Sequence, residues 1–188
     1  MKTVESIAKS LNGKKIILRL DLNVPLNRQK ITDSNRIDKI IPTLNFLIKN
    51  KAKILILSHV GRPKGKVIKE LSMEPICDYL KNKLGQNIHL IKSNINNFKD
   101  EDLFYKKNES ILMLENLRFY NEEEENNEEF AKILAGFGDL YVNDAFSCSH
   151  RAHTSVGKIT EFLPSFAGLQ LETEINALKK VTTEIKKP

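Results

Sequence analysis

The sequence contains no tryptophan, only 2 cysteines, and no apolar run near the ~18 residues that a membrane span requires. Cys77 and Cys148 form no C-x-x-C pair, which excludes a disulfide framework and a zinc finger and predicts free thiols. The opening residues, MKTVESIAKSLNGKK, lack the apolar block of a secretory signal. These absences predict a cytoplasmic protein that makes no contact with a membrane.

Glycine (8) and proline (6) are also scarce among the 188 residues, whereas hydrophobic residues make up 40% and charged residues 29%. This composition excludes disordered and fibrous proteins. The length matches one domain, on the usual range of ~100–200 residues per domain, and is sufficient to bury a core. We therefore expect a single globular domain.

Apolar runs and helical periodicity alternate along the chain. Strands are expected at 15–24, 54–57, 87–91, 110–116 and 139–146, and helices at 34–49, 73–84, 122–135 and 155–162. A last amphipathic helix carries Leu171, Ile175, Leu178, Val181 and Ile185 on one face, and 92–109 is expected to be mainly loop. This alternation predicts an α/β fold with an open doubly wound parallel sheet, a Rossmann-like three-layer α/β/α single domain.

Arginine is used sparingly, since 24 of the 30 basic residues are Lys and only six are Arg. Arg19 and Arg28 are expected to have structural roles. The other four follow expected strand ends or open a helix, with His59, His150 and His153 nearby: Arg36, Arg62, Arg118 and Arg151. Ligands of doubly wound sheets bind outside the carboxyl ends of strands, and Arg holds phosphate or carboxylate through paired donors. The pattern predicts an anion-binding site.

Polar residues at the end of the first strand add to this site. Asp21 and Asn23 lie two apart, hence on one face, and could bind substrate hydroxyls or cap the loop; position alone also allows Asp21 as a base. Gly61, a candidate substrate-binding residue, would let the backbone approach an anion, or would only serve the turn. The acidic run at 122–129 is expected to be a solvated helix start without a ligand role.

Nucleotide and metal signatures are missing. The segment G-R-P-K-G-K at 61–66 is one residue short of a phosphate loop and is followed by Val67 instead of Ser or Thr. The segment G-F-G at 136–138 precedes a strand and opens no helix, so it is no dinucleotide fingerprint. No spacing of His, Cys, Asp or Glu predicts a metal site, and no cofactor is expected to bind this chain.

Four segments occur together, in this order: R-L-D-L-N-V-P-L, S-H-V-G-R-P, L-E-N-L-R-F, and N-D-A-F followed by H-R-A-H-T-S. The set resembles phosphoglycerate kinase over essentially the whole chain, but only the N-terminal half of that two-domain family. S-C-S at 147–149 departs from the family, which more often has a small run such as G-T-A there. The resemblance gives Arg36 a catalytic role in stabilising the transferring phosphoryl group. It implies that 3-phosphoglycerate contacts Asp21, Asn23, Arg36, His59, Arg62, Arg118 and Arg151.

The resemblance also implies an activity: reversible phosphoryl transfer between ATP and the carboxylate of 3-phospho-D-glycerate, a phosphotransferase reaction of glycolysis and gluconeogenesis. Mg-ATP or Mg-ADP would be bound mainly by an absent C-terminal nucleotide half, and 1,3-bisphosphoglycerate would be the other ligand of this half. Residues 1–170 would form the substrate domain, and 171–188 the start of an interdomain helix. We expect a monomer that is inactive without the nucleotide half.

Two other classes of function compete with this interpretation. A net charge of +6 and a pI of 9.2 suit a nucleic-acid-binding module, but aromatic residues are only 7% and do not alternate with basic residues as in a stacking platform. We expect no nucleic acid partner. A phosphoacceptor signalling domain would use Asp21 at a strand end, but it would need an acidic pair where Asn23 and His59 stand.

Overall fold

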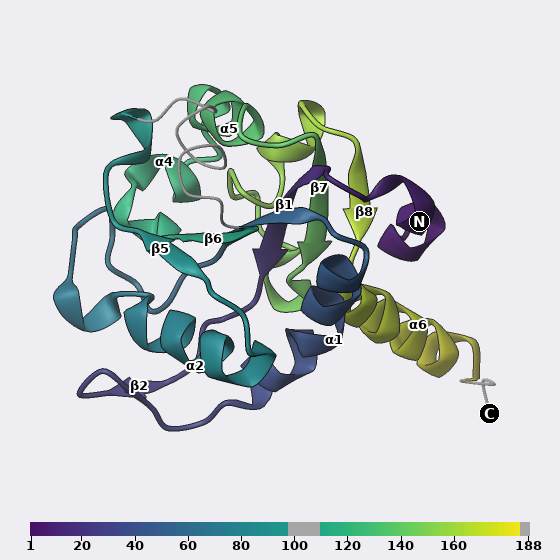
Figure 1. The fold of residues 1–188 in the computed structure, drawn as a ribbon, viewed down its shortest axis with the longest axis horizontal. Coiled ribbons are helices and arrows are strands. Elements are labelled where there is room, and N and C mark those ends of the chain that lie inside the picture. Colours follow the sequence, from purple (N-terminus) through teal and green to yellow (C-terminus); the bar gives the residue numbers. More distant parts are fainter. Residues whose placement is uncertain (98–109, 185–188) are drawn as a thin grey trace.

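The computed structural model describes residues 1–97 and 110–184. Six parallel strands form one sheet in the order β5-β6-β4-β1-β7-β8 (Figure 1). Their bounds are β1 Lys15–Leu20, β4 Lys53–Leu57, β5 His89–Ile91, β6 Ile111–Leu114, β7 Leu140–Asp144 and β8 Ser165–Ala167. The order reverses at β1, which pairs with β4 on one side and β7 on the other. The prediction of an open doubly wound parallel sheet is confirmed.

Both faces of the sheet are covered, because the central strands are apolar at nearly every position. Ile16 and Leu18 of β1 face the helices α1 (Asn35–Lys49) and α2 (Glu74–Leu84). Ile17, between them, faces the opposite side, where α5 (Glu128–Ala135) packs. Figure 1 shows these helices on opposite sides of the sheet. The alternation of side chains along each strand thus builds two hydrophobic layers.

The structure corrects several boundaries. The first strand ends at Leu20 and does not extend to residue 24, because the chain turns while Leu22 and Val24 stay buried. Three short strands were not predicted: β8, and the hairpin strands β2 (Leu26–Asn27) and β3 (Lys30–Ile31). The expected helix at 155–162 is a 3-10 turn, Lys158–Glu161. Each of these elements is too short to show a period in the sequence.

The expected helix at 122–135 is broken into α4 (Asn121–Glu124) and α5. Asn126 has a φ of 52°, in the left-handed region, and stops α4. The Asn127 side chain then accepts a hydrogen bond from the Phe130 N–H and caps α5. Only part of the acidic run is therefore a solvated helix start.

The remaining short helices are 3-10 turns. They are η1 Val4–Ser10, η2 Lys69–Leu71, η3 Ile95–Asn97, η4 Leu117–Phe119 and η5 Phe146–Cys148. The loop expected at 92–109 contains η3, and 98–109 lie outside the described residues.

The last helix, α6 (Leu169–Glu184), is anchored at its start by the buried carboxylate of Asp144. Asp144 accepts a hydrogen bond from the Thr43 hydroxyl at 2.6 Å and from the Leu171 N–H at 2.9 Å. The helix then leaves the domain (Figure 1), and Leu178 and Val181 of its apolar face are 53% and 59% exposed. Among the described residues, no helix is long and apolar enough to cross a membrane.

Candidate functional site

The candidate residues lie in the segments that follow β1, β4, β6 and β7, at the carboxyl edge of the sheet, with Arg36 in the first turn of α1. Parallel strands all end at this edge, so residues distant in the sequence become neighbours there. The structure describes all eight predicted site residues: Asp21, Asn23, Arg36, His59, Gly61, Arg62, Arg118 and Arg151.

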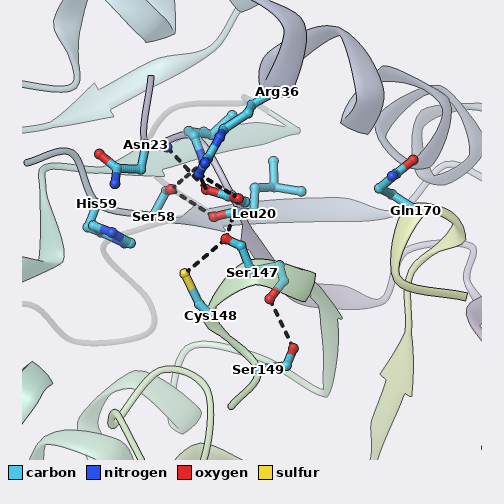
Figure 2. A network of polar contacts seen from close by, with 12 residues as sticks. Leu20, Asn23, Arg36, Ser58, His59, Ser147, Cys148, Ser149 and Gln170 are labelled. Atoms are coloured by element: carbon cyan, nitrogen blue, oxygen red, sulfur yellow. Dashed lines mark hydrogen bonds and ion pairs between the residues drawn. The ribbon is translucent and has the colours of Figure 1, made fainter. Parts of the chain in front are cut away.

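Asp21 and Arg36 form an ion pair, which we call the rim pair. Arg36 extends from the first turn of α1, and its Nη1 lies 3.1 and 3.2 Å from the two Asp21 carboxylate oxygens. The Ser147 hydroxyl also donates to this carboxylate at 2.5 Å, and Figure 2 shows Ser147 and Arg36 in the same network of polar contacts. The Arg36 side chain is 51% exposed and that of Asp21 is 14% exposed. The rim pair is therefore open to solvent on the arginine side.

Asn23, Gly61 and Arg118 are joined through the backbone of Gly61. The Gly61 N–H donates to Asn23 Oδ1 at 2.9 Å, and the Gly61 carbonyl accepts from Arg118 Nη1 at 3.0 Å. Gly61 has a φ of +63°, and a Cβ there would lie 2.8 Å from the Leu71 side chain. At this φ any other residue would be strained, so Gly61 serves the turn, and its role toward a ligand stays a prediction.

Arg118 is buried although it is an arginine. Its backbone N–H donates to the Asn116 side chain, and Asn116 in turn donates to the Val60 carbonyl. Among the described residues, Nε of Arg118 and Nδ1 of His153 are the two buried side-chain nitrogens or oxygens without a hydrogen-bond partner. Arg118 Nε lies 3.6 Å from Glu124 Oε1, which is an ion pair beyond hydrogen-bond length. Burial lowers the pKa of the Arg118 guanidinium, which remains charged. The unfilled Nε–H of a buried guanidinium is suited to an anion, and His153 Nδ1 can add a second hydrogen bond when it carries the ring proton.

His59 is 2% exposed, and burial is the largest cause that lowers the pKa of its ring, to about 2. The nearby charges of Arg19, Arg118 and Arg151 act in the same direction, as does His153. His59 is therefore neutral at physiological pH. It can donate or accept one hydrogen bond at a ligand but cannot add a positive charge to the site.

Arg19, to which the sequence assigned only a structural role, contacts this histidine. It is fully buried in β1, and its Nη2 lies 2.8 Å from His59 Nδ1. Its Nε donates to the Ser155 hydroxyl at 2.8 Å. A charged residue within an otherwise apolar strand was the one signal in the sequence that could have identified it.

Glu123 completes this group and corrects the prediction that the acidic run is solvated. It is 1% exposed, and its carboxylate accepts from the Ser155 hydroxyl at 2.5 Å and from the Ser155 N–H at 3.0 Å. Burial raises the pKa of the Glu123 carboxyl, while Arg19 and the two Ser155 hydrogen bonds lower it. We call Arg19, His59, Ser155 and Glu123 the buried arginine network.

Arg62 and Arg151 are less constrained. Arg62 is exposed after β4, and Arg151 is half-buried after η5, close enough to His59 to influence its pKa. Neither forms a hydrogen bond to another candidate side chain in the part of the chain that the structure describes. Both remain free to rotate toward a ligand.

Of two cavities on the surface, one adjoins the candidate residues and the other lies apart from them. One of about 190 Å³ lies beside the rim pair and is also lined by Lys39, Ser147 and Gln170. A larger pocket of about 420 Å³, near Phe119 and Tyr120, contains none of the eight predicted residues. Within residues 1–97 and 110–184, no group of three or more His, Cys, Asp and Glu side chains is placed to hold a metal ion.

Comparisons with known proteins identify the family of this chain. The model of the family described as phosphoglycerate kinase matches residues 5–188. A phosphoglycerate kinase of Bartonella bacilliformis is 46% identical over 179 residues, and one of Prochlorococcus marinus is 47% identical over 180. These matches cover 95% and 94% of the chain, but 45% of each relative. The chain thus spans about half the length of these relatives.

Solved structures give the same result. The phosphoglycerate kinase of Coxiella burnetii superposes with a TM-score of 0.83 at 36% identity, covering 95% of this chain and 44% of that one. The phosphoglycerate kinase of Pyrococcus horikoshii superposes with a TM-score of 0.86 at 30% identity, covering 100% and 47%.

Proposed function

Because this chain belongs to the phosphoglycerate kinase family, we propose that it provides the site for 3-phospho-D-glycerate. The proposed reaction is reversible phosphoryl transfer between ATP and the substrate carboxylate, in glycolysis and gluconeogenesis. The proposal includes a cytoplasmic location and a monomeric chain. It assigns nucleotide binding to a second, C-terminal half, and the relatives, of which the match covers 45%, are long enough to contain such a half.

The observation that carries the proposal is the pair of buried, unfilled nitrogen atoms, Arg118 Nε and His153 Nδ1. Leaving a buried donor without a partner costs about 1–3 kcal/mol, so such atoms call for a ligand. The phosphate of 3-phosphoglycerate supplies acceptor oxygens for both. Arg151 and Arg62, on the adjoining loops, are long enough to add donors from the solvent side.

The other end of the substrate is assigned to the rim pair. We propose that Asp21 and Asn23 bind the substrate hydroxyl, and that Arg36 turns from Asp21 toward the transferring phosphoryl group. An exposed ion pair is worth only about 0–1 kcal/mol, so the exchange of partners is energetically small. The geometry of the free state, with both Asp21 oxygens already bonded to Arg36, keeps the two groups within reach of one ligand.

The proposed chemistry needs no proton transfer. The carboxylate is ionised at neutral pH, so its oxygen attacks the terminal phosphorus of ATP directly, the bond to the bridging oxygen breaks, and ADP leaves with the electron pair. Alignment and charge stabilisation are the requirements, and arginines supply both. The neutral His59 fits this scheme, because a general acid or base would need a pKa near the working pH.

The described residues present neither a metal-ligand cluster nor a phosphate loop for MgATP. We therefore propose that this chain by itself binds 3-phosphoglycerate without turnover, and that approach of the nucleotide half excludes water from the reaction. A coupled assay of the 188-residue chain with MgATP should show no turnover above background. Robust turnover would overturn the need for a second half.

The direct test of binding is a titration with 3-phosphoglycerate followed by amide NMR shifts, with inorganic phosphate at matched ionic strength as the control. Shifts centred on Asp21, Arg36, Arg118 and Arg151, larger for 3-phosphoglycerate than for phosphate, are expected. Shifts spread over the lysines, with no preference between the two anions, would contradict the proposed function.

A further inference from the structure

Arg19 makes a set of contacts that fixes its orientation within β1. Nε donates to the Ser155 hydroxyl, Nη1 to the Leu20 carbonyl, and Nη2 contacts His59 Nδ1 at 2.8 Å. The residue is fully buried, so no water competes for these donors. Each of the three guanidinium nitrogens thus has a named acceptor.

The contact with His59 determines where the imidazole proton sits. A guanidinium has five N–H donors and no acceptor, so His59 Nδ1 must accept and cannot carry a hydrogen. The neutral ring then carries its proton on Nε2. In the part of the chain that the structure describes, the Arg19 contact is the one hydrogen bond of this ring. Nε2–H therefore has no protein acceptor, and because it is not among the buried unpaired atoms, it faces solvent.

We propose that Arg19 is a positioning residue that holds His59 as the Nε2–H tautomer, so that the ring donates one hydrogen bond to an anionic oxygen of the substrate. This inference rests on the proposed function for the identity of the substrate. The residue itself lies behind His59 and touches no ligand. Its role is to select the tautomer of a side chain that would otherwise exist in two.

Ser155 and Glu123 stabilise the buried charge of Arg19 in this position. The Ser155 hydroxyl donates to Glu123 Oε1 and therefore accepts from Arg19 Nε, so it connects the two charges. Burial raises the pKa of the Glu123 carboxyl, and the hydrogen bonds that both of its oxygens accept from Ser155 offset part of this effect. The Ser155 carbonyl in turn accepts from the Tyr141 hydroxyl at 2.7 Å, which fixes the position of Ser155.

The charged and titratable groups that influence His59 come from strand β1 and from the segments after β6 and β7. Arg19 lies on β1, Arg118 follows β6, and Arg151 and His153 follow β7. Glu123, the buried carboxylate of the network, bonds to Ser155 and does not bond to the His59 ring. A second proton on His59 would face three arginines. The ring is thus limited to one donated hydrogen bond, in one direction.

The first experiment uses the unmodified chain with ¹⁵N-labelled histidine. Long-range proton–nitrogen correlation spectra should show His59 with a bare Nδ1 and a protonated Nε2, and a hydrogen-bond coupling from an Arg19 guanidinium proton to Nδ1. The exposed His150 provides the reference signal of a ring in water. A protonated Nδ1, or two tautomers in exchange, would overturn the proposal.

The second experiment removes Arg19 without leaving a lone buried charge. The double variant Arg19→Met/Glu123→Gln replaces both charges together, and the introduced amide can still donate to and accept from Ser155. We expect His59 to populate both tautomers and 3-phosphoglycerate to bind about tenfold more weakly, the effect of one charge-assisted hydrogen bond. Arg28→Met, which removes an exposed arginine of the hairpin, is the matched control and should change neither.

The outcomes separate the two proposals. A pure Nε2–H tautomer without 3-phosphoglycerate binding in the unmodified chain sustains the role of Arg19 in setting the tautomer, but contradicts the proposed function and the assigned ligand. Binding with the other tautomer contradicts only the role of Arg19. A double variant that keeps the pure tautomer and full affinity also overturns that role. If the double variant does not fold, the coupling between Arg19 and His59 in the unmodified chain decides the question.

Discussion

The rim pair and the buried arginine network hold their charged side chains in opposite environments, one exposed and one buried. In the rim pair, Arg36 is 51% exposed and shares Asp21 with Ser147. In the buried arginine network, Arg19 is fully buried and Glu123 is 1% exposed, with Ser155 between them. Water screens the first pair, whereas no water reaches the second.

The difference shows how one site can keep a fixed geometry in one part and change its ion-pair partners in another. A screened pair contributes little to stability and can release its partners to a ligand at small cost. A buried pair is hard to break, because removing one partner leaves a charge in a medium of low dielectric constant. The network is therefore expected to set geometry, and the rim pair is expected to change partners.

Breaking the buried network should have the largest effect. Glu123→Ala removes the carboxyl that Ser155 connects to the buried Arg19 charge, and should lower the free energy of unfolding by about 3–5 kcal/mol. Urea denaturation measures this. Glu125→Ala, at an exposed glutamate of the same acidic run, should change it by less than about 0.5 kcal/mol. Equal losses in the two variants would show that Arg19 does not depend on Glu123.

Breaking the rim pair should affect binding and leave stability nearly unchanged. Arg36→Ala removes a charge-assisted hydrogen bond worth about 1.5–3 kcal/mol, so 3-phosphoglycerate should bind about tenfold more weakly or worse. The NMR titration measures the dissociation constant. Lys39→Ala, which removes a cation from the wall of the same cavity, is the control and should cost much less. Unchanged binding would exclude Arg36 from the ground-state site.

The neutral His59 makes a smaller, pH-dependent contribution. Its pKa is lowered from 6.5 to about 2 in the folded chain, so below pH 6.5 the unfolded chain takes up a proton that the folded chain does not. The contribution of His59 to the free energy of unfolding is fully present above pH 6.5 and decreases as the pH falls toward the pKa of the folded chain. Going from about pH 7.5 to 5.5, the unmodified chain should lose about 1 kcal/mol more than His59→Gln. Parallel losses in urea denaturation would mean that His59 is charged when folded.

The smallest expected effect concerns Ser147, which stands where the family more often has a small residue. Its hydroxyl occupies an Asp21 oxygen that the substrate hydroxyl is proposed to use. Ser147→Ala should therefore tighten 3-phosphoglycerate binding by about two- to threefold, roughly 0.5 kcal/mol. 3-Phosphonooxypropionate, which differs from 3-phosphoglycerate only in lacking the hydroxyl, serves as the comparison and should bind equally to both chains. Weaker binding of 3-phosphoglycerate would show that Ser147 assists Asp21 and does not compete.

The amino-acid sequence alone was sufficient to predict the fold class, because apolar runs and helical periodicity are local properties that the parallel sheet and its helices preserve. It also placed the arginines at one edge, since strand ends share an edge in this topology. Its errors fall on short elements and on Glu123, whose burial depends on an Asn126 turn and a loop 32 residues away.

Which charges pair with one another depends on how the strands and loops pack. Asp21 and Arg36 are 15 residues apart, Asn23 and Gly61 are 38 apart, and Arg19 and Ser155 are 136 apart. No local pattern encodes these pairings, because each partner is brought by a different strand and loop. Arg19 shows the difference most clearly. Its residue type and position are present in the sequence, but its function follows from the burial and the hydrogen-bond acceptors that the packed sheet provides.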